Sequence, residues 1–214
     1  MKNENNNRDA LKMRIRDNHP QVYLTLVSII VALALEDLFS EVRGIYAGPG
    51  PDTTTVLLWL QIIGAFFTSF NVWVGYCQIL ITSRWVLGIW DALSVMSLLV
   101  ILFLINSSVG ASNATWWFCA VGAMLLAAAF ILRINLQRAM SEPDNVTNAL
   151  PPPNSWFVVL TAICGFLALS FGLLVFLDTV SVFVITLFAA IIALFAASWS
   201  FVWVKVWSKS VGLS

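Results

Sequence analysis

The chain has 214 residues, of which 60% are hydrophobic and only 10% are charged, and its formal net charge at pH 7 is zero. A soluble globular domain carries about 25% charged residues, so this composition excludes a protein whose whole surface faces water. The balanced charge gives no basis for nucleic-acid binding, and the lipid bilayer is the expected partner.

The first 20 residues are polar and basic, and we expect them to form a cytoplasmic tail. An apolar run follows and predicts a membrane helix over residues 22–41. The start of this run also resembles a secretory signal peptide, with Ala32-Leu33-Ala34 as a cleavage site. Because the helical pattern continues past Ala34, we expect the segment to be retained.

Five further apolar segments predict membrane helices, at residues 56–82, 85–105, 116–136, 156–177 and 180–206. A tight turn at Asp178 joins the last two of these helices. The expected fold class is therefore all-α, a polytopic membrane protein with six transmembrane helices. We divide the chain into a basic tail (1–20), a four-helix membrane unit (21–139), a cytoplasmic linker (140–154), a C-terminal two-helix hairpin (155–207) and a cytoplasmic tail (208–214).

The distribution of lysine and arginine predicts the orientation of this bundle. If the amino terminus is cytoplasmic, Arg43 alone among the 11 Lys and Arg residues falls on the outer side. Cytoplasmic loops carry an excess of these residues. We therefore expect a multi-pass protein of the plasma (inner) membrane with both termini in the cytoplasm.

The most informative segment is the second predicted helix. Polar or small residues recur along it at alternating steps of three and four, which places them on one helical face. These residues are Gln61, Gly64, Thr68, Asn71, Gly75, Gln78 and Thr82, and we call them the polar stripe. At 1.5 Å rise per residue the stripe is about 32 Å long, close to the thickness of the hydrocarbon core.

The polar stripe has two interpretations. It could line a route for a cation or small polar solute, or it could pack dry against another helix through small residues and amide hydrogen bonds. The two C-terminal helices carry small-residue seams without amides: Thr161, Gly165, Ala168 and Gly172 on one, and Ala189, Ala193, Ala196 and Ser200 on the other. Both seams are expected to be packing faces.

Several acids complete the candidate sites. Glu36, Asp37 and Glu41 form a predicted outer acidic cluster, which would attract cations or reach the headgroup water. Asp91 lies in the third predicted helix, where it either closes the inner end of a polar route or pairs with Arg84. The predicted polar pathway thus comprises Asp37, Gln61, Thr68, Asn71, Gln78 and Asp91.

Enzymatic chemistry has little support. His19 is the only histidine, and the three cysteines fall in separate apolar runs, so neither a metal site nor a catalytic triad is predicted. Phosphate-binding and dinucleotide-binding glycine motifs are also missing from the sequence. We expect no enzyme activity, no cofactor and no metal.

The run from Ile29 to Leu35 with Leu38-Phe39, followed by a tryptophan-bearing helix and a short turn into Trp85, resembles bacterial six-helix inner-membrane proteins of unknown function. The resemblance covers the first three predicted helices. Phe39-Ser40-Glu41 is also similar to the Phe-Ser-Asp signature of the prokaryotic and lysosomal six-helix potassium channels, but it lies at the opposite end of its helix. No pore residue is carried over from that family.

Two functional hypotheses follow. The first is a small oligomeric channel or transporter for a cation or small polar solute, with Asp37, Asn71 and Asp91 as outer, central and inner stations. The alternative is a non-transporting scaffold, sensor or accessory subunit that uses the second helix to bind a helix of a partner membrane subunit.

Overall fold

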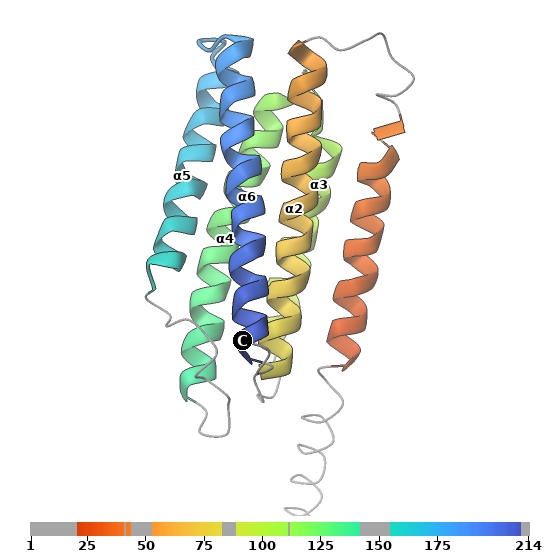
Figure 1. The fold of residues 1–214 in the computed structure, drawn as a ribbon, viewed down its shortest axis with the longest axis vertical. Coiled ribbons are helices and arrows are strands. Elements are labelled where there is room, and N and C mark those ends of the chain that lie inside the picture. The colour runs from red at the N-terminus through yellow and green to blue at the C-terminus, as the bar shows by residue number, and fades with distance from the viewer. Residues whose placement is uncertain are drawn as a thin grey trace, which may run out of the picture.

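The computed structural model describes residues 21–40, 42–43, 53–82, 89–110, 112–141 and 155–210, and every regular element in these ranges is an α-helix. An N-terminal helix, Gln21–Ser40, precedes five others. These are α2 (Thr53–Thr82), α3 (Ile89–Ser107), α4 (Ala114–Ser141), α5 (Trp156–Phe176) and α6 (Val182–Ser210). The helices lie lengthwise in one elongated bundle (Figure 1). The predicted all-α fold is confirmed.

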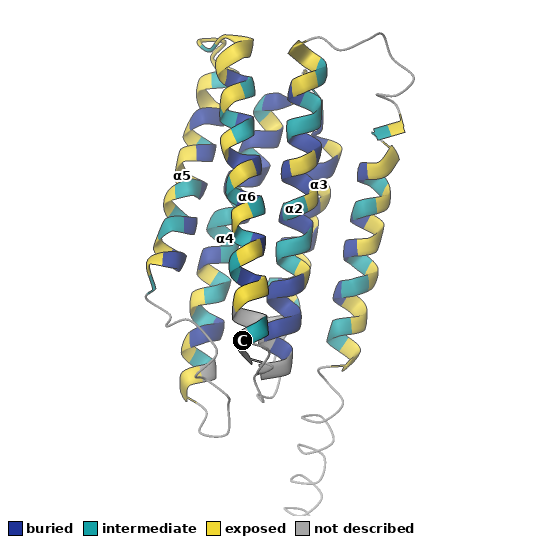
Figure 2. Ribbon diagram, in the orientation of Figure 1, coloured by how far each residue is buried: buried dark blue, intermediate teal, exposed yellow. Residues whose placement is uncertain are grey.

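Five of the six described helices are long and apolar enough to cross a membrane: Gln21–Ser40, Thr53–Gln78, Ala114–Arg138, Trp156–Phe176 and Val182–Lys205. The apolar part of α3, Ala92–Ser107, is shorter. A helix suits hydrocarbon because it satisfies its own backbone hydrogen bonds. The exposed residues of these helices lie on the outside of the bundle and the buried ones inside it (Figure 2). The chain has the character of a multi-pass membrane protein, while six spans and two cytoplasmic termini stay predictions.

Two helices run four or more residues past their predicted ends. α4 extends to Ser141, beyond the predicted end at residue 136, because Gln137 and Arg138 are good helix formers and do not break the helix. α6 extends to Ser210 rather than 206. The predicted turn at Asp178 is confirmed, since its backbone has a φ of 53° between α5 and α6. Aspartate tolerates this left-handed conformation better than most residues do.

Helices α4 and α5 pack closely against each other. A Cβ atom added to Gly122 would lie 2.7 Å from the backbone nitrogen of Leu169 and 2.8 Å from the carbonyl oxygen of Gly165. One added to Gly165 would meet the backbone nitrogen of Leu126 at 3.0 Å. Small residues let two helix backbones approach in this way. The predicted packing role of the α5 seam is confirmed, because Thr161, Gly165, Ala168 and Gly172 are all buried.

The N-terminal helix packs through Val27, Val31, Ala34 and Leu38, which are buried at a helical spacing. Two polar contacts fix its position. The Asn106 amide of α3 donates a hydrogen bond to the Ala34 carbonyl oxygen. The indole nitrogen of Trp73 in α2 donates to the Ser28 hydroxyl at 2.9 Å. The N-terminal helix therefore borders both α2 and α3.

Candidate functional site

The polar stripe of α2 faces the interior of the bundle. Gln61, Thr68 and Gln78 are buried, as are both glycines of the stripe, and Asn71 is half-buried. Ile63, Phe66 and Trp73 on other faces of α2 are exposed. For Thr82 only the backbone is described. The amphipathic character predicted from the sequence is thus present, with the polar face turned toward protein.

At one end of the stripe, Gln61 holds the connection between α3 and α4. Its side-chain oxygen accepts a hydrogen bond from the Gly110 backbone nitrogen at 2.9 Å, and its side-chain nitrogen donates to the Gly110 carbonyl oxygen at 3.5 Å. Gly110 has a φ of +150°, a conformation that residues with a Cβ rarely adopt. Gln61 therefore acts as an anchor for this turn.

Near the middle of the stripe, Asn71 joins α2 to α6. Its Nδ2 amide donates to the Ala196 carbonyl oxygen at 2.8 Å, and its Oδ1 accepts from the Ser200 hydroxyl at 2.8 Å. Ser200 also lies 3.2 Å from the Ala196 carbonyl oxygen, so its single hydroxyl hydrogen is shared between two acceptors. Both α6 residues belong to the predicted seam, which is confirmed as a packing face because Ala189, Ala193, Ala196 and Ser200 are buried.

The two glycines of the stripe each face a buried tryptophan. A Cβ atom added to Gly64 would lie 3.1 Å from Cζ2 of Trp117 in α4. One added to Gly75 would lie 3.4 Å from Cζ2 of Trp203 in α6. Each glycine leaves room for an indole ring against the α2 backbone, which explains why these two positions of the stripe are small.

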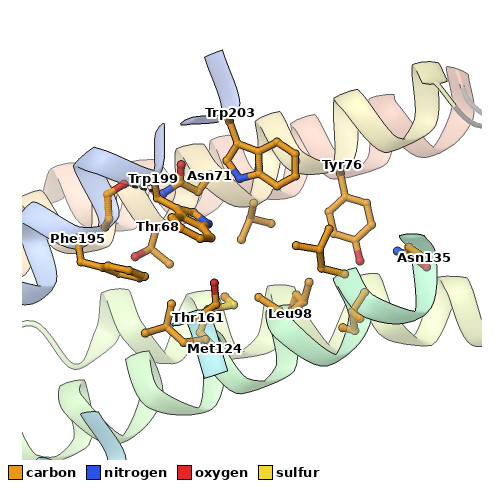
Figure 3. A pocket seen from close by; sticks show the side chains of 17 residues that line it. Thr68, Asn71, Tyr76, Leu98, Met124, Asn135, Thr161, Phe195, Trp199 and Trp203 are labelled. Carbon is orange, nitrogen blue, oxygen red and sulfur yellow. Dashed lines mark hydrogen bonds between the residues drawn. The ribbon is translucent and has the colours of Figure 1, made fainter. Parts of the chain in front are cut away.

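Between these contacts the bundle contains a cavity of about 100 Å³, lined by residues from α2, α3, α4, α5 and α6 (Figure 3). The stripe contributes Thr68, Asn71 and Gly75 to its wall. Most of the lining is apolar or aromatic, and none of the 17 lining residues is charged. At this cavity the polar stripe borders open space inside the bundle.

Two buried polar groups at the cavity were not singled out from the sequence. Asn135 of α4 and Trp203 of α6 are 6% and 4% exposed. Within the described part of the chain, neither the Asn135 amide nor the Trp203 indole nitrogen has a hydrogen-bond partner. An amide in the apolar run of the fourth predicted helix was the available signal for Asn135. Its direction toward the cavity depends on helix packing.

Neither Glu36 nor Asp37 lines this cavity. Glu36 is exposed and Asp37 half-buried, Glu41 lies outside the described residues, and only the backbone of Asp91 is described. The N-terminal helix meets α2 at a groove that includes Leu38, Trp59, Ile62 and Phe66. These α2 residues do not belong to the polar stripe. The structure brings Gln61, Thr68, Asn71 and Gln78 onto one interior face and does not bring Asp37 to it.

Metal-binding residues are also scattered. Among the residues that the structure describes, no three histidine, cysteine, aspartate or glutamate side chains come close enough to hold an ion. Cys77, Cys119 and Cys164 are free thiols on α2, α4 and α5.

Comparison of the chain with protein-family models, with curated proteins and with solved structures gave no match. Function must therefore be inferred from the geometry of the bundle itself.

Proposed function

We propose that this membrane protein is a carrier that binds a small uncharged solute in the cavity beside α2. The observation that supports this most directly is that two largely buried polar residues, Asn135 and Trp203, border the cavity and have no side-chain hydrogen-bond partner among the residues that the structure describes. A bound solute can give each of these groups a partner, and such a hydrogen bond contributes about 0.5–1.5 kcal/mol.

An uncharged solute fits this site better than a cation does. A cation in an apolar cavity needs carboxylates or several carbonyl ligands to replace its hydration. None of the described lining residues is charged, and the predicted station Asp37 is not among them. The proposed role of the stripe is thus to supply hydrogen bonds at the cavity, while Gln61 and Asn71 hold neighbouring segments together. The proposal assigns no catalytic step.

The distribution of Lys and Arg supports a particular placement of the protein in its membrane. We place the protein in the plasma (inner) membrane with both termini in the cytoplasm, where ten of its 11 Lys and Arg residues would then lie. The proposal includes assembly as a homo-oligomer or with a partner membrane subunit. Such contacts would involve outward faces of the bundle, because the polar stripe already has partners within the chain.

Cysteine accessibility at two neighbouring positions tests whether solutes reach the cavity. Thr68 and Ser69 are adjacent and buried, and each donates a hydrogen bond to the carbonyl oxygen four residues earlier. Only Thr68 lines the cavity. Each would be changed to cysteine in a variant whose three native cysteines are replaced by alanine, and then exposed to a small uncharged thiol reagent.

We expect Thr68→Cys to react and Ser69→Cys to remain unmodified in protein that retains its unfolding midpoint. Protection of the Thr68→Cys thiol by excess solute would strengthen the result. If neither thiol reacts in folded protein, the cavity is closed to solutes and the carrier proposal is wrong. The non-transporting scaffold or accessory subunit would then be the better account.

A further inference from the structure

We infer that the ligand of this cavity is a small neutral aromatic molecule carrying one hydrogen-bonding group, as phenol does. This inference rests on the proposed function and specifies its ligand class. Three features of the cavity support this ligand class: the different residues at its two ends, the packing of its aromatic side chains and its volume.

The cavity has two chemically different ends (Figure 3). Phe195 and Trp199 lie at one end, close to Asn71, whose amide is already bonded to α6. Tyr76 and Asn135 lie at the other end, with Leu98 between the two groups. A ligand with an apolar body and a polar head would match this arrangement, because each part would meet lining of its own kind.

The aromatic end is a fixed surface. The Trp199 ring stacks on Phe157 with a centroid distance of 3.7 Å and on Phe195 with a centroid distance of 5.3 Å. Phe157 also meets the Trp203 ring edge to face at 5.7 Å. Rings held in this way cannot rotate to fill the cavity. Aromatic pairs gain about 0.5–1.5 kcal/mol beyond area burial, so a ring is preferred to a saturated body here.

The polar groups at the cavity determine which hydrogen bonds the polar group of the ligand, its head, must donate or accept. The indole nitrogen of Trp203 is a donor only, and the Asn135 amide is both donor and acceptor. A hydroxyl group can accept from the indole or from the amide, and it can donate to the amide oxygen. An ionised head would be left without a counter-charge, since no lining residue is charged. The head is therefore a neutral hydroxyl, carbonyl or amide.

The size of the cavity limits the ligand to a single ring. An engineered protein cavity of about 150 Å³ binds benzene. The cavity in this bundle is about 100 Å³, so one ring with one polar substituent requires only a small outward movement of its walls. Larger fused ring systems do not fit without repacking the helices.

Nuclear magnetic resonance of the indole groups provides the test. The full-length protein would be labelled with 15N-tryptophan in detergent micelles, and the Trp203 signal identified from Trp203→Phe. Phenol, benzene and cyclohexanol would be titrated in turn. Trp156 is 68% exposed on the outside of α5, so its signal reports ligand that merely partitions into the micelle.

We expect phenol to shift the Trp203 signal saturably and to bind roughly 3- to 10-fold more tightly than benzene, as one added hydrogen bond predicts. Cyclohexanol is expected to bind more weakly than phenol. Asn135→Leu should retain benzene binding and bring the phenol-to-benzene ratio close to one. Gln137→Leu, which removes an exposed amide from the same helix, should leave the ratio unchanged.

The outcomes separate the two proposals. If none of the three compounds shifts the Trp203 signal saturably, the inferred ligand class is wrong, and the reactivity of Thr68→Cys then decides separately whether the cavity admits any solute. If benzene binds as tightly as phenol, or if Asn135→Leu leaves the ratio unchanged, the cavity binds solutes but the inferred ligand class is wrong. If cyclohexanol matches phenol, the preference for a ring is wrong.

Discussion

Replacement of Asn71 by leucine tests the physical role of the polar stripe. The change removes two hydrogen bonds between α2 and α6, to Ala196 and from Ser200. Side-chain hydrogen bonds within membrane bundles contribute about 0.6 kcal/mol on average. Leucine has the same number of side-chain heavy atoms in the same branched shape, and the freed Ser200 hydroxyl can turn fully to the Ala196 carbonyl oxygen at 3.2 Å. We therefore expect the free energy of unfolding to fall by only about 1 kcal/mol.

Asn135→Leu is the matched comparison, because it replaces another amide at the same cavity. Asn135 has no hydrogen-bond partner among the described residues, so its replacement removes no protein contact. The amide must lose its hydration when the bundle forms, and leucine does not bear this cost. We expect Asn135→Leu to raise the free energy of unfolding by about 1 kcal/mol in the absence of ligand.

Both free energies can be measured by reversible unfolding in mixed micelles of increasing denaturing-detergent fraction, followed by tryptophan fluorescence. A double-mutant cycle of Asn71→Leu with Ser200→Ala should give a coupling energy of about 0.6 kcal/mol. If Asn135→Leu destabilises the protein as much as Asn71→Leu does, the Asn135 amide has a structural partner. The inference that the cavity offers an unpartnered amide to a ligand would then be wrong.

Three further changes test the packing of the bundle. Gly165→Val forces a side chain against the α4 backbone and should lower the free energy of unfolding by about 1–3 kcal/mol, whereas Ser170→Val on the exposed face of α5 should have little effect in the same assay. Gln61→Leu removes the bonds that hold Gly110, so the Gly110 amide should exchange with solvent hydrogen at least about tenfold faster; an unchanged rate would disprove the anchoring role. Ser28→Ala removes only the hydroxyl that accepts the hydrogen bond from the Trp73 indole, and it should cost at most about 0.6 kcal/mol in unfolding experiments.

The helices and their packing faces were largely readable from the sequence. A span of 20 or more apolar residues has few alternatives to a helix in lipid, because every backbone polar group must be bonded internally. The seam of Thr161, Gly165, Ala168 and Gly172 was predicted from helical spacing alone, and α5 buries these residues. Boundaries were less certain, as α4 shows, because charged residues at the end of a span continue a helix as readily as they end it.

The candidate site was only partly predictable. Helical periodicity placed Gln61, Thr68, Asn71 and Gln78 on one face, and that face is buried. Periodicity cannot say which helix lies opposite, so the assignment of Gln61 to the Gly110 turn and of Asn71 to α6 was not foreseen. The same limit made Asp37 a natural candidate for the stripe, although its helix borders a different face of α2.

The sequence by itself determined the membrane-protein character of the chain, its all-α class and the amphipathic character of α2. These properties depend on composition and on contacts between residues that are close in the chain. Only the tertiary structure decided that much of the stripe is bonded within the chain, and that Asn135 and Trp203 line the same cavity, whose described lining residues are uncharged. Those two residues are far apart in sequence and lie on different helices. Whether both line one cavity depends on how glycines and tryptophans fit where helices cross, and helical periodicity carries no information about that fit.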